Sequence, residues 1–237
     1  KTLVSKRLFY LCLIILLVIL ATGCTGERVR VEVPPKVPTE GINTIAILEF
    51  TNDADDPGLA REMENLLIDY FQKHGRFIIV ERHRFHSTLR PQELLRPQKA
   101  RELGSQLGVD AFIIASATYY SEDVVVDPPR RTGSYDGRSY WTSQQTTDVQ
   151  VQMSGRLIDA QTGMIIHSKS TEGHDWTHQT IHFPDWSGDN LEPPPRQLIP
   201  RANRSDIPRT RKRAIESTVI SFAADFYPTY KYVRVDN

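Results

Sequence analysis

Residues 42–50, INTIAILEF, decide the fold of this chain, because the four side chains at positions 45–48 are all apolar and leave no polar face. A strand of this kind is typical of the buried centre of a sheet that is covered on both sides. The sequence that follows predicts a covering helix, since residues 55–57 (DDP) carry helix-start signals and Gly75 supplies a stop. At helical spacing this helix would bury Leu59, Met63, Leu66, Leu67, Tyr70 and Phe71.

The alternation of strand and helix continues along the chain. Residues 77–80 predict a second strand, a helix follows from Pro97 to Gly108, and residues 111–119 predict a third strand. Short spacing between these elements indicates crossover connections and a sheet that is at least partly parallel.

The second half of the chain changes character. Apolar and polar residues alternate from Thr146, residues 159–163 (DAQTG) predict a turn, and residues 164–168 predict a returning strand. A last helix follows Pro208, and residues 230–235 predict a closing strand. We therefore predict an α/β fold, a three-layer-like sandwich around a mixed sheet in the order β-α-β-α-β-β-β-α-β.

Two segments match neither pattern. Residues 121–145 and 169–207 contain proline clusters and aromatic residues without a clear period. Loops of this length are usually functional or disordered. We expect one domain over residues 42–237 that carries these segments as two long irregular insertions.

The first residues resemble a bacterial export signal that ends in a cysteine. Three basic residues precede a 13-residue apolar run from Leu8 to Leu20, and small residues lead to Cys24. This run is short for a transmembrane helix and is typical of a secretory signal over residues 1–23. We predict that Cys24 becomes the lipidated mature N-terminus; the alternative is an ordinary signal peptide with an incidental cysteine.

The sequence also predicts where the lipid would hold the protein. Thr25, not aspartate, follows the cysteine, which in bacterial lipoproteins indicates sorting to the outer membrane. Residues 24–41 are rich in proline and charge, and we expect them to act as a tether. The domain would therefore lie at the periplasmic face, with no cofactor other than the covalent lipid on Cys24.

Composition limits the remaining function classes. The chain has 29 basic and 29 acidic residues, and removal of residues 1–23, with three basic residues and no acidic one, leaves a net charge of −3. This charge does not favour nucleic acid as a partner. Because Cys12 and Cys24 are the only cysteines, the folded body can use neither disulfides nor a cysteine nucleophile.

Four blocks in this order resemble the CsgG-type outer-membrane lipoproteins. They are residues 45–52 (IAILEFTN), 75–82 (GRFIIVER), 102–110 (ELGSQLGVD) and 159–163 (DAQTG). The resemblance covers roughly residues 43–168 and implies the same α/β fold. Members of this group include curli export pores, periplasmic rings of polysaccharide export and activators of cell-wall synthases, and none is known as an enzyme.

The resemblance leaves an export pore as an alternative function. Such a pore places two amphipathic hairpins in the bilayer, at positions corresponding to the two irregular segments, and each membrane strand needs about nine to eleven alternating residues. Residues 121–145 mix aromatic with charged residues, and prolines interrupt residues 169–207. Neither segment fits a surface that faces lipid along its whole length.

The strongest charge feature is a basic cluster at the start of the last helix, composed of Arg209, Arg211, Lys212 and Arg213. Cations at a helix N-terminus oppose the helix dipole, so either an acidic neighbour in the chain or an anionic partner must compensate them. A solvated basic loop is the alternative. We predict contact with an anionic surface such as peptidoglycan, lipid head groups or an acidic protein.

Candidate metal sites are weak. His174, His178 and His182 recur every fourth residue, but Gly173 and Pro184 argue against a helix, so we expect loop histidines that meet solvent. The arginine-rich surroundings of His83 and His86 also disfavour a cation. Residues 52–56 (NDADD) lack the later glycine and glutamate of a calcium loop and fit helix capping better.

No hydrolase or phosphate-binding motif occurs in the chain, so an envelope hydrolase is only a second alternative. The sequence predicts a lipid-anchored periplasmic component of an outer-membrane or secretion complex. It would act by protein contact rather than catalysis. Its partners would be envelope or secretion proteins, and a homo-oligomeric ring is compatible with the resemblance.

Overall fold

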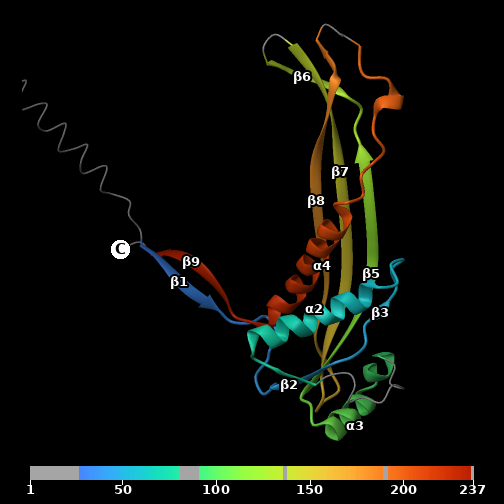
Figure 1. Cartoon of the computed structure of the whole chain (residues 1–237). Coiled ribbons are helices and arrows are strands. Elements are labelled where there is room, and N and C mark those ends of the chain that lie inside the picture. The colour runs from blue at the N-terminus through green and yellow to red at the C-terminus, as the bar shows by residue number, and fades with distance from the viewer. Residues whose placement is uncertain (1–26, 81–90, 136–137, 189–191, 236–237) are drawn as a thin grey trace, which may run out of the picture. The chain divides into compact units, whose positions relative to one another are not determined.

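The computed structural model describes residues 27–80, 91–135, 138–188 and 192–235 (Figure 1). The signal segment, Cys24, His83 and His86 lie outside these residues. The described chain forms two compact units, one from Pro35 to Tyr227 and one from the segments on either side of it. None of the helices in the described ranges combines the length and hydropathy of a membrane span.

The strand predicted from INTIAILEF lies inside the seven-stranded sheet of the larger unit. Strand β2 (Thr44–Ile47) pairs in parallel with β4 (Ile78–Val80) on one side and β5 (Ala111–Val126) on the other. The short strand β3 (Thr51–Asn52) continues along β5. Side chains at positions 45–48 are all buried, as predicted.

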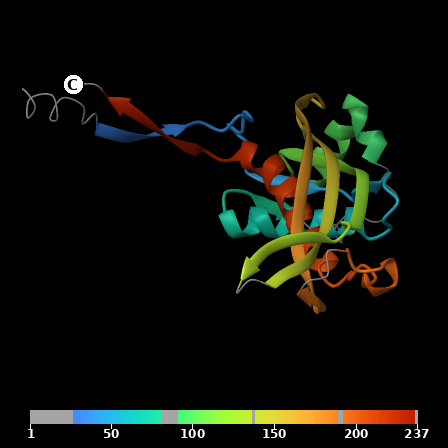
Figure 2. The same ribbon diagram turned by 90° about the horizontal axis from the view of Figure 1, so that it is seen from above.

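Helices cover both faces of this part of the sheet (Figures 1 and 2). Ile45 and Ile47 pack into a core with α2 (Leu59–His74) and α4 (Ile207–Ala223). Ala46 and Leu48 point the other way, toward α3 (Pro97–Leu107) and the 3-10 helix η2 (Pro91–Leu95). Alternate residues of one strand therefore fill two cores, and the predicted α/β sandwich with a mixed sheet is confirmed.

Two glycines end the helices as predicted. Gly75 and Gly108 both have a φ of 65°, in the left-handed region that other residues adopt at a cost. Their backbone N–H groups donate to the carbonyls of Phe71 and Gly104 respectively. The position of each glycine in the sequence therefore predicts where its helix ends.

The two segments expected to be irregular are instead mostly strands. Strand β5 runs to Val126, β6 covers Arg130–Tyr135, β7 covers Arg138–Asp159 and β8 covers Ile165–Gly188. β7 pairs antiparallel with β5 on one side and β8 on the other. Serine, threonine and glutamine on both faces hid the two-residue period, and backbone pairing to β7 outweighed this polarity. Among the described residues of the two segments, 127–129 and 192–206 keep the predicted irregular character, with the 3-10 helix η3 (Arg196–Leu198) in the second stretch.

The two ends of the described chain also differ from expectation. Part of the predicted tether forms β1 (Glu27–Val33), and the closing strand β9 (Thr229–Val235) pairs with it rather than with the main sheet. The tether prediction rested on prolines, which begin only at Pro34. Residues 27–33 before them alternate charge and valine, which suits a strand.

Helix α4 lies unusually close to the β7–β8 hairpin. A Cβ atom on Gly173 would lie 2.0 Å from the Ala214 carbonyl oxygen, and one on Gly155 would lie 2.5 Å from the Phe222 ring. Both distances are shorter than a contact between such atoms allows. The two glycines therefore set the distance between the helix and the sheet.

We predict that Gly173→Ala lowers the free energy of unfolding by about 1–3 kcal/mol, because the added methyl group must displace the α4 backbone. Urea denaturation followed by circular dichroism measures this change. Gly58→Ala is the matched control, since its nearest neighbour, an Asp56 oxygen, would lie at an ordinary 3.5 Å. Equal stability of the two variants would refute the close approach.

The far end of α4 is held by a buried carboxylate. Asp225, in the 3-10 helix η4 (Ala224–Phe226), pairs with Lys169 at 2.9 Å and with Lys36 at 3.0 Å. Burial by itself raises the pKa of Asp225, but the hydrogen bonds from the two lysines outweigh burial and lower it. His167 lies 3.6 Å from the same carboxylate, and burial lowers the pKa of this histidine although Asp225 opposes the change.

These shifts predict lower stability in acid. The unfolded chain takes up a proton on His167 as pH falls through about 6.5, before the folded protein does, so stability drops from there downward by at most about 1.4 kcal/mol per pH unit. The lowered pKa of Asp225 adds a second loss only below about pH 3.9. We expect His167→Gln to reduce the loss between pH 7.5 and 5.5 in urea titrations. His178→Gln, at an exposed site, should leave it unchanged.

Candidate functional site

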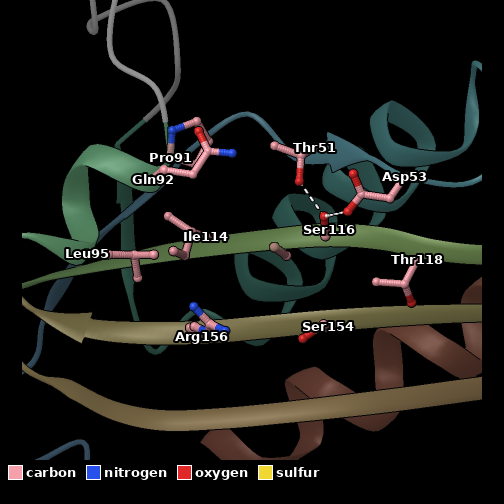
Figure 3. A pocket seen from close by; sticks show the side chains of 11 residues that line it. Thr51, Asp53, Pro91, Gln92, Leu95, Ile114, Ser116, Thr118, Ser154 and Arg156 are labelled. Carbon is pink, nitrogen blue, oxygen red and sulfur yellow. Dashed lines mark hydrogen bonds between the residues drawn. The ribbon is translucent and has the colours of Figure 1, made fainter.

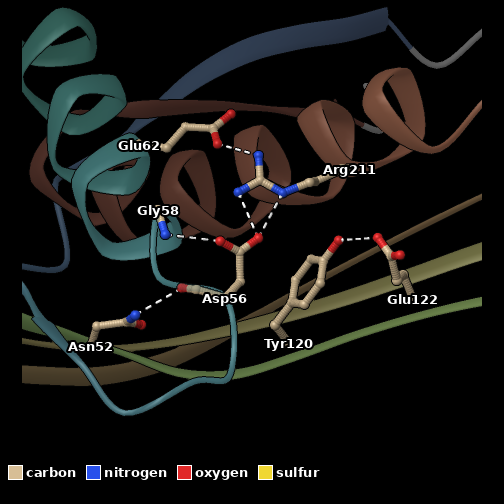
Figure 4. A network of polar contacts seen from close by, with 7 residues as sticks. All are labelled: Asn52, Asp56, Gly58, Glu62, Tyr120, Glu122 and Arg211. Atoms are coloured by element: carbon tan, nitrogen blue, oxygen red, sulfur yellow. Dashed lines mark hydrogen bonds and ion pairs between the residues drawn. The ribbon is translucent and has the colours of Figure 1, made fainter.

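The basic cluster at the start of α4 is partly neutralised by the chain itself (Figure 4). The Nε and Nη2 atoms of Arg211 donate to Oδ2 of Asp56 at 3.1 and 3.0 Å, and its Nη1 donates to Glu62 on α2. Burial alone would lower the pKa of Arg211, but the two carboxylates raise it above its ordinary value. Asp56 also accepts from the Gly58 N–H, so the expected cap residue instead joins the loop to α4.

The other three cations differ in their surroundings. Lys212 lies 3.8 Å from Glu216 and Arg213 lies 3.7 Å from Asp175, whereas Arg209 is exposed and has no such partner among the described residues. The sequence left open whether an acidic neighbour in the chain or an anionic partner compensates the cluster. For Arg211 it is the acidic neighbours Asp56 and Glu62. Contact of the exposed cations with an anionic partner stays a prediction.

Arg211 and Arg209 stand two residues apart and allow a matched test. We predict that Arg211→Ala lowers the free energy of unfolding by about 1.5–3 kcal/mol, because the carboxylates of Asp56 and Glu62 lose charged hydrogen bonds. Arg209→Ala should change it by less than about 0.5 kcal/mol. Thermal and urea unfolding of both variants decide the point, and similar losses would mean that Arg211 is not a structural residue.

A second polar group continues this network along the sheet. The Tyr120 hydroxyl donates to Glu122 at 2.6 Å, and Arg204, from the irregular segment, pairs with the same glutamate. Burial and the Glu122 hydrogen bond raise the pKa of Tyr120. Residues 192–206 are thereby fixed to the face of the sheet that α4 also covers, where Gln145 exchanges two hydrogen bonds with the Asn203 backbone.

The three histidines lie on a strand, not in a loop. Strand β8 places His174, His178 and His182 on one face, and four residues of strand separate neighbours by roughly 13 Å. One ion cannot bridge such distances. His174 instead pairs with Asp148 at 2.8 Å, and His178 bonds with Thr146 at 3.0 Å. Within the described ranges no cluster of three or more metal-ligand side chains occurs.

The histidines belong to a larger surface that sequence reasoning missed. A bulge at Thr118 reverses the facing of β5, so that odd-numbered residues after it share a face with even-numbered residues of β7 and β8. We call this surface the open face. It consists of four cross-strand rows: Tyr119, Gln152 and Glu172; Ser121, Gln150 and His174; Asp123, Asp148 and Trp176; and Val125, Thr146 and His178.

The open face is accessible and chemically mixed. Trp176 is 52% exposed, Val125 57% and Tyr119 42%. The Trp176 ring lies 4.4 Å from the His178 ring, and Gln150 donates to Glu172 at 2.6 Å. This surface offers flat aromatic groups surrounded by polar side chains, which is the composition of a protein-binding surface. Only the alternation from Thr146 signalled it in the sequence.

A cavity of about 280 Å³ lies between η2 and the strands β3, β5 and β7 (Figure 3). Ser116 donates to Asp53 at 2.7 Å and bonds with Thr51, and Arg156 lines the cavity from β7. This arrangement suits the binding of a small polar group.

Residues 32–188 match the family described as curli production assembly/transport component CsgG. The match covers about two thirds of the chain. The chain therefore belongs to the CsgG family, and the resemblance stated from its four sequence blocks is confirmed.

Solved structures with a related chain path share little sequence with this protein. Lipoprotein GNA1162 from Neisseria meningitidis is 12% identical, covers 57% of this chain and 84% of its own, and has a TM-score of 0.40. The PelC dodecamer from Paraburkholderia phytofirmans is 10% identical, with 84% and 98% covered and a TM-score of 0.39. The LpoB C-terminal domain from Salmonella enterica is 18% identical, with 55% and 82% covered and a TM-score of 0.34. No curated protein sequence matches the chain.

Proposed function

We propose that this CsgG-family protein is a lipid-anchored component of an envelope assembly or export complex, held at the periplasmic face of the outer membrane. Its lipid would sit on Cys24, and its work would be protein contact rather than catalysis. The family match supports the envelope role. The open face is the observation that carries the contact function.

The position of the open face favours a partner. On the opposite side of β5, β7 and β8, α4 and residues 192–206 cover the sheet, so the strands already have one packed face. The open face, in contrast, exposes Trp176 on the edge strand β8, where it ends the row that begins with Asp123 and Asp148. Polar groups in the neighbouring rows hydrogen-bond to one another. Tryptophan within a polar surround is a frequent energetic centre of protein interfaces.

An export pore is the second candidate, because strands as long as β7 and β8 exceed the length that spans a bilayer. A membrane hairpin, however, needs one face that is apolar over its whole span. Here the open face carries Asp123, Asp148 and Glu172, and the covered face carries Glu122 and Asp175. The placement of charge on both faces therefore favours contact over a pore.

Site-directed photocrosslinking in intact cells tests the contact function. We expect benzoylphenylalanine in place of Trp176 to form a discrete adduct with another envelope protein, identified by mass spectrometry. The same group in place of Gln72, exposed on α2, is the matched control and should form none. A detergent-retaining ring that conducts ions in planar bilayers, without an adduct at position 176, would instead support the pore.

The anchor has its own test. Labelled palmitate should enter the wild-type protein and not the Cys24→Ser variant, because the Cys24 sulfur is the atom that carries the diacylglyceryl group. The variant should also leave the outer-membrane fraction. Equal labelling of both proteins would remove the proposed location.

A further inference from the structure

The two-stranded ribbon of β1 and β9 separates its side chains into two different faces. Antiparallel pairing places Val29 opposite Val233, and Val31 opposite Lys231. Together with Val33, these valines form what we call the valine face. The valine face also carries Lys231 and, at the start of β1, Glu27. The other face, here the arginine–tyrosine face, carries Arg28, Arg30, Glu32, Arg234, Tyr230 and Tyr232.

The valine face is not covered within the ribbon. Val29 is 41% exposed, Val31 39% and Val233 38%. A two-stranded ribbon is only marginally stable in water and needs a surface against its apolar side. An apolar side of this kind, repeated on both strands, therefore requires an occupant.

The arginine–tyrosine face indicates what that occupant is. The guanidinium carbon of Arg30 lies 3.7 Å from the centre of the Tyr230 ring, and Tyr230 and Tyr232 are 51% and 70% exposed. Tyrosine and basic residues are the side chains that gather at the boundary between lipid and water. The ribbon carries four basic and two acidic residues, so its charge is complementary to anionic head groups.

Chain geometry brings the ribbon to such a boundary. Only Thr25 and Gly26 separate Cys24 from the first residue of β1, so at most about 10 Å of chain lies between them. If Cys24 carries the lipid, the ribbon is therefore confined to the membrane surface. This step rests on the proposed anchor.

We propose that the β1–β9 ribbon lies in the head-group region of the leaflet that holds the Cys24 lipid, with the valine face toward the acyl chains. The arginine–tyrosine face then remains among head groups and water. Lys231, which lies opposite Val31 on the valine face, extends its long side chain from there toward phosphate. The ribbon adds a second attachment to the covalent lipid. It also orders the chain that the sequence suggested was a slack tether.

Cysteine content makes this orientation measurable. In the mature lipidated protein the Cys24 sulfur is bound to lipid, so an introduced cysteine is the only free thiol. Val233→Cys and Tyr232→Cys place a fluorescent nitrobenzoxadiazole group at adjacent residues of β9, one on each face of the ribbon. Asn65→Cys, exposed on α2 in the larger unit, gives the background signal.

The proteins are reconstituted in vesicles of phosphatidylethanolamine and phosphatidylglycerol, with or without lipids that carry a spin label in the acyl chain. We expect the label at position 233 to shift to the blue and to be quenched about threefold more than the label at position 65. The label at position 232 should be quenched less than that at position 233. Replacing Val29 and Val31 by serine should abolish the quenching at position 233 while the protein still floats with the vesicles.

The outcomes separate the ribbon from the anchor. Flotation with quenching at position 233 no greater than at position 65 overturns the ribbon proposal and leaves the anchor intact. A reactive thiol in the protein without an introduced cysteine, together with loss of flotation, overturns the anchor. A blue shift at position 233 that rises with protein concentration in lipid-free Cys24→Ser protein shows that a second copy covers the valine face, which also overturns the proposal.

Discussion

The close packing of α4 against two glycines of the β7–β8 hairpin is the constraint on which the rest of the larger unit depends. Because Gly173 and Gly155 carry no Cβ, the helix backbone can rest directly on the sheet. One end of α4 then brings Arg211 to the carboxylates of Asp56 and Glu62. The other end brings Asp225 to Lys169. A larger residue at position 173 would move both charged contacts at once.

This packing also explains why the long ends of β5, β7 and β8, beyond the parallel strands, are covered on one face and open on the other. Helix α4 and the segment held by Gln145 and Arg204 occupy the same side of β5, β7 and β8. The second layer of helices, α3 and η2, packs against Phe112, Ile114 and Ile158, near the parallel strands. Beyond Ser116 that layer has no counterpart among the described residues, and the open face begins.

The accuracy of sequence-based prediction followed the strength of the apolar pattern. The run at positions 45–48 and the stripe from Leu59 to Phe71 leave no competing arrangement, so the core, the two helices and their glycine stops could be predicted. Residues 121–145 and 169–188 carry polar side chains on both faces, and their strand structure depends on pairing with β7, which no local pattern shows. The prediction that His174, His178 and His182 are loop residues was wrong for the same reason, because they lie on β8, a strand that the sequence pattern did not predict at these positions. For the basic cluster, the sequence predicted that the cations at the start of the helix need negative charge nearby. Only the fold could show that Asp56 and Glu62 supply this charge to Arg211.

The chemistry of the open face also constrains the kind of contact that it makes. Its cross-strand pairs, such as Gln150 with Glu172 and His174 with Asp148, are exposed and contribute only about 0.2–1 kcal/mol each. A partner must therefore either replace these hydrogen bonds or leave them with water, and neither offers the large apolar burial of a permanent interface. Trp176 on the edge strand β8 and Tyr119 on β5 supply the large aromatic surfaces, and the polar rows beside them supply register rather than affinity. An arrangement of this kind fits a reversible, hydrated contact, as a component that joins and leaves an envelope assembly requires.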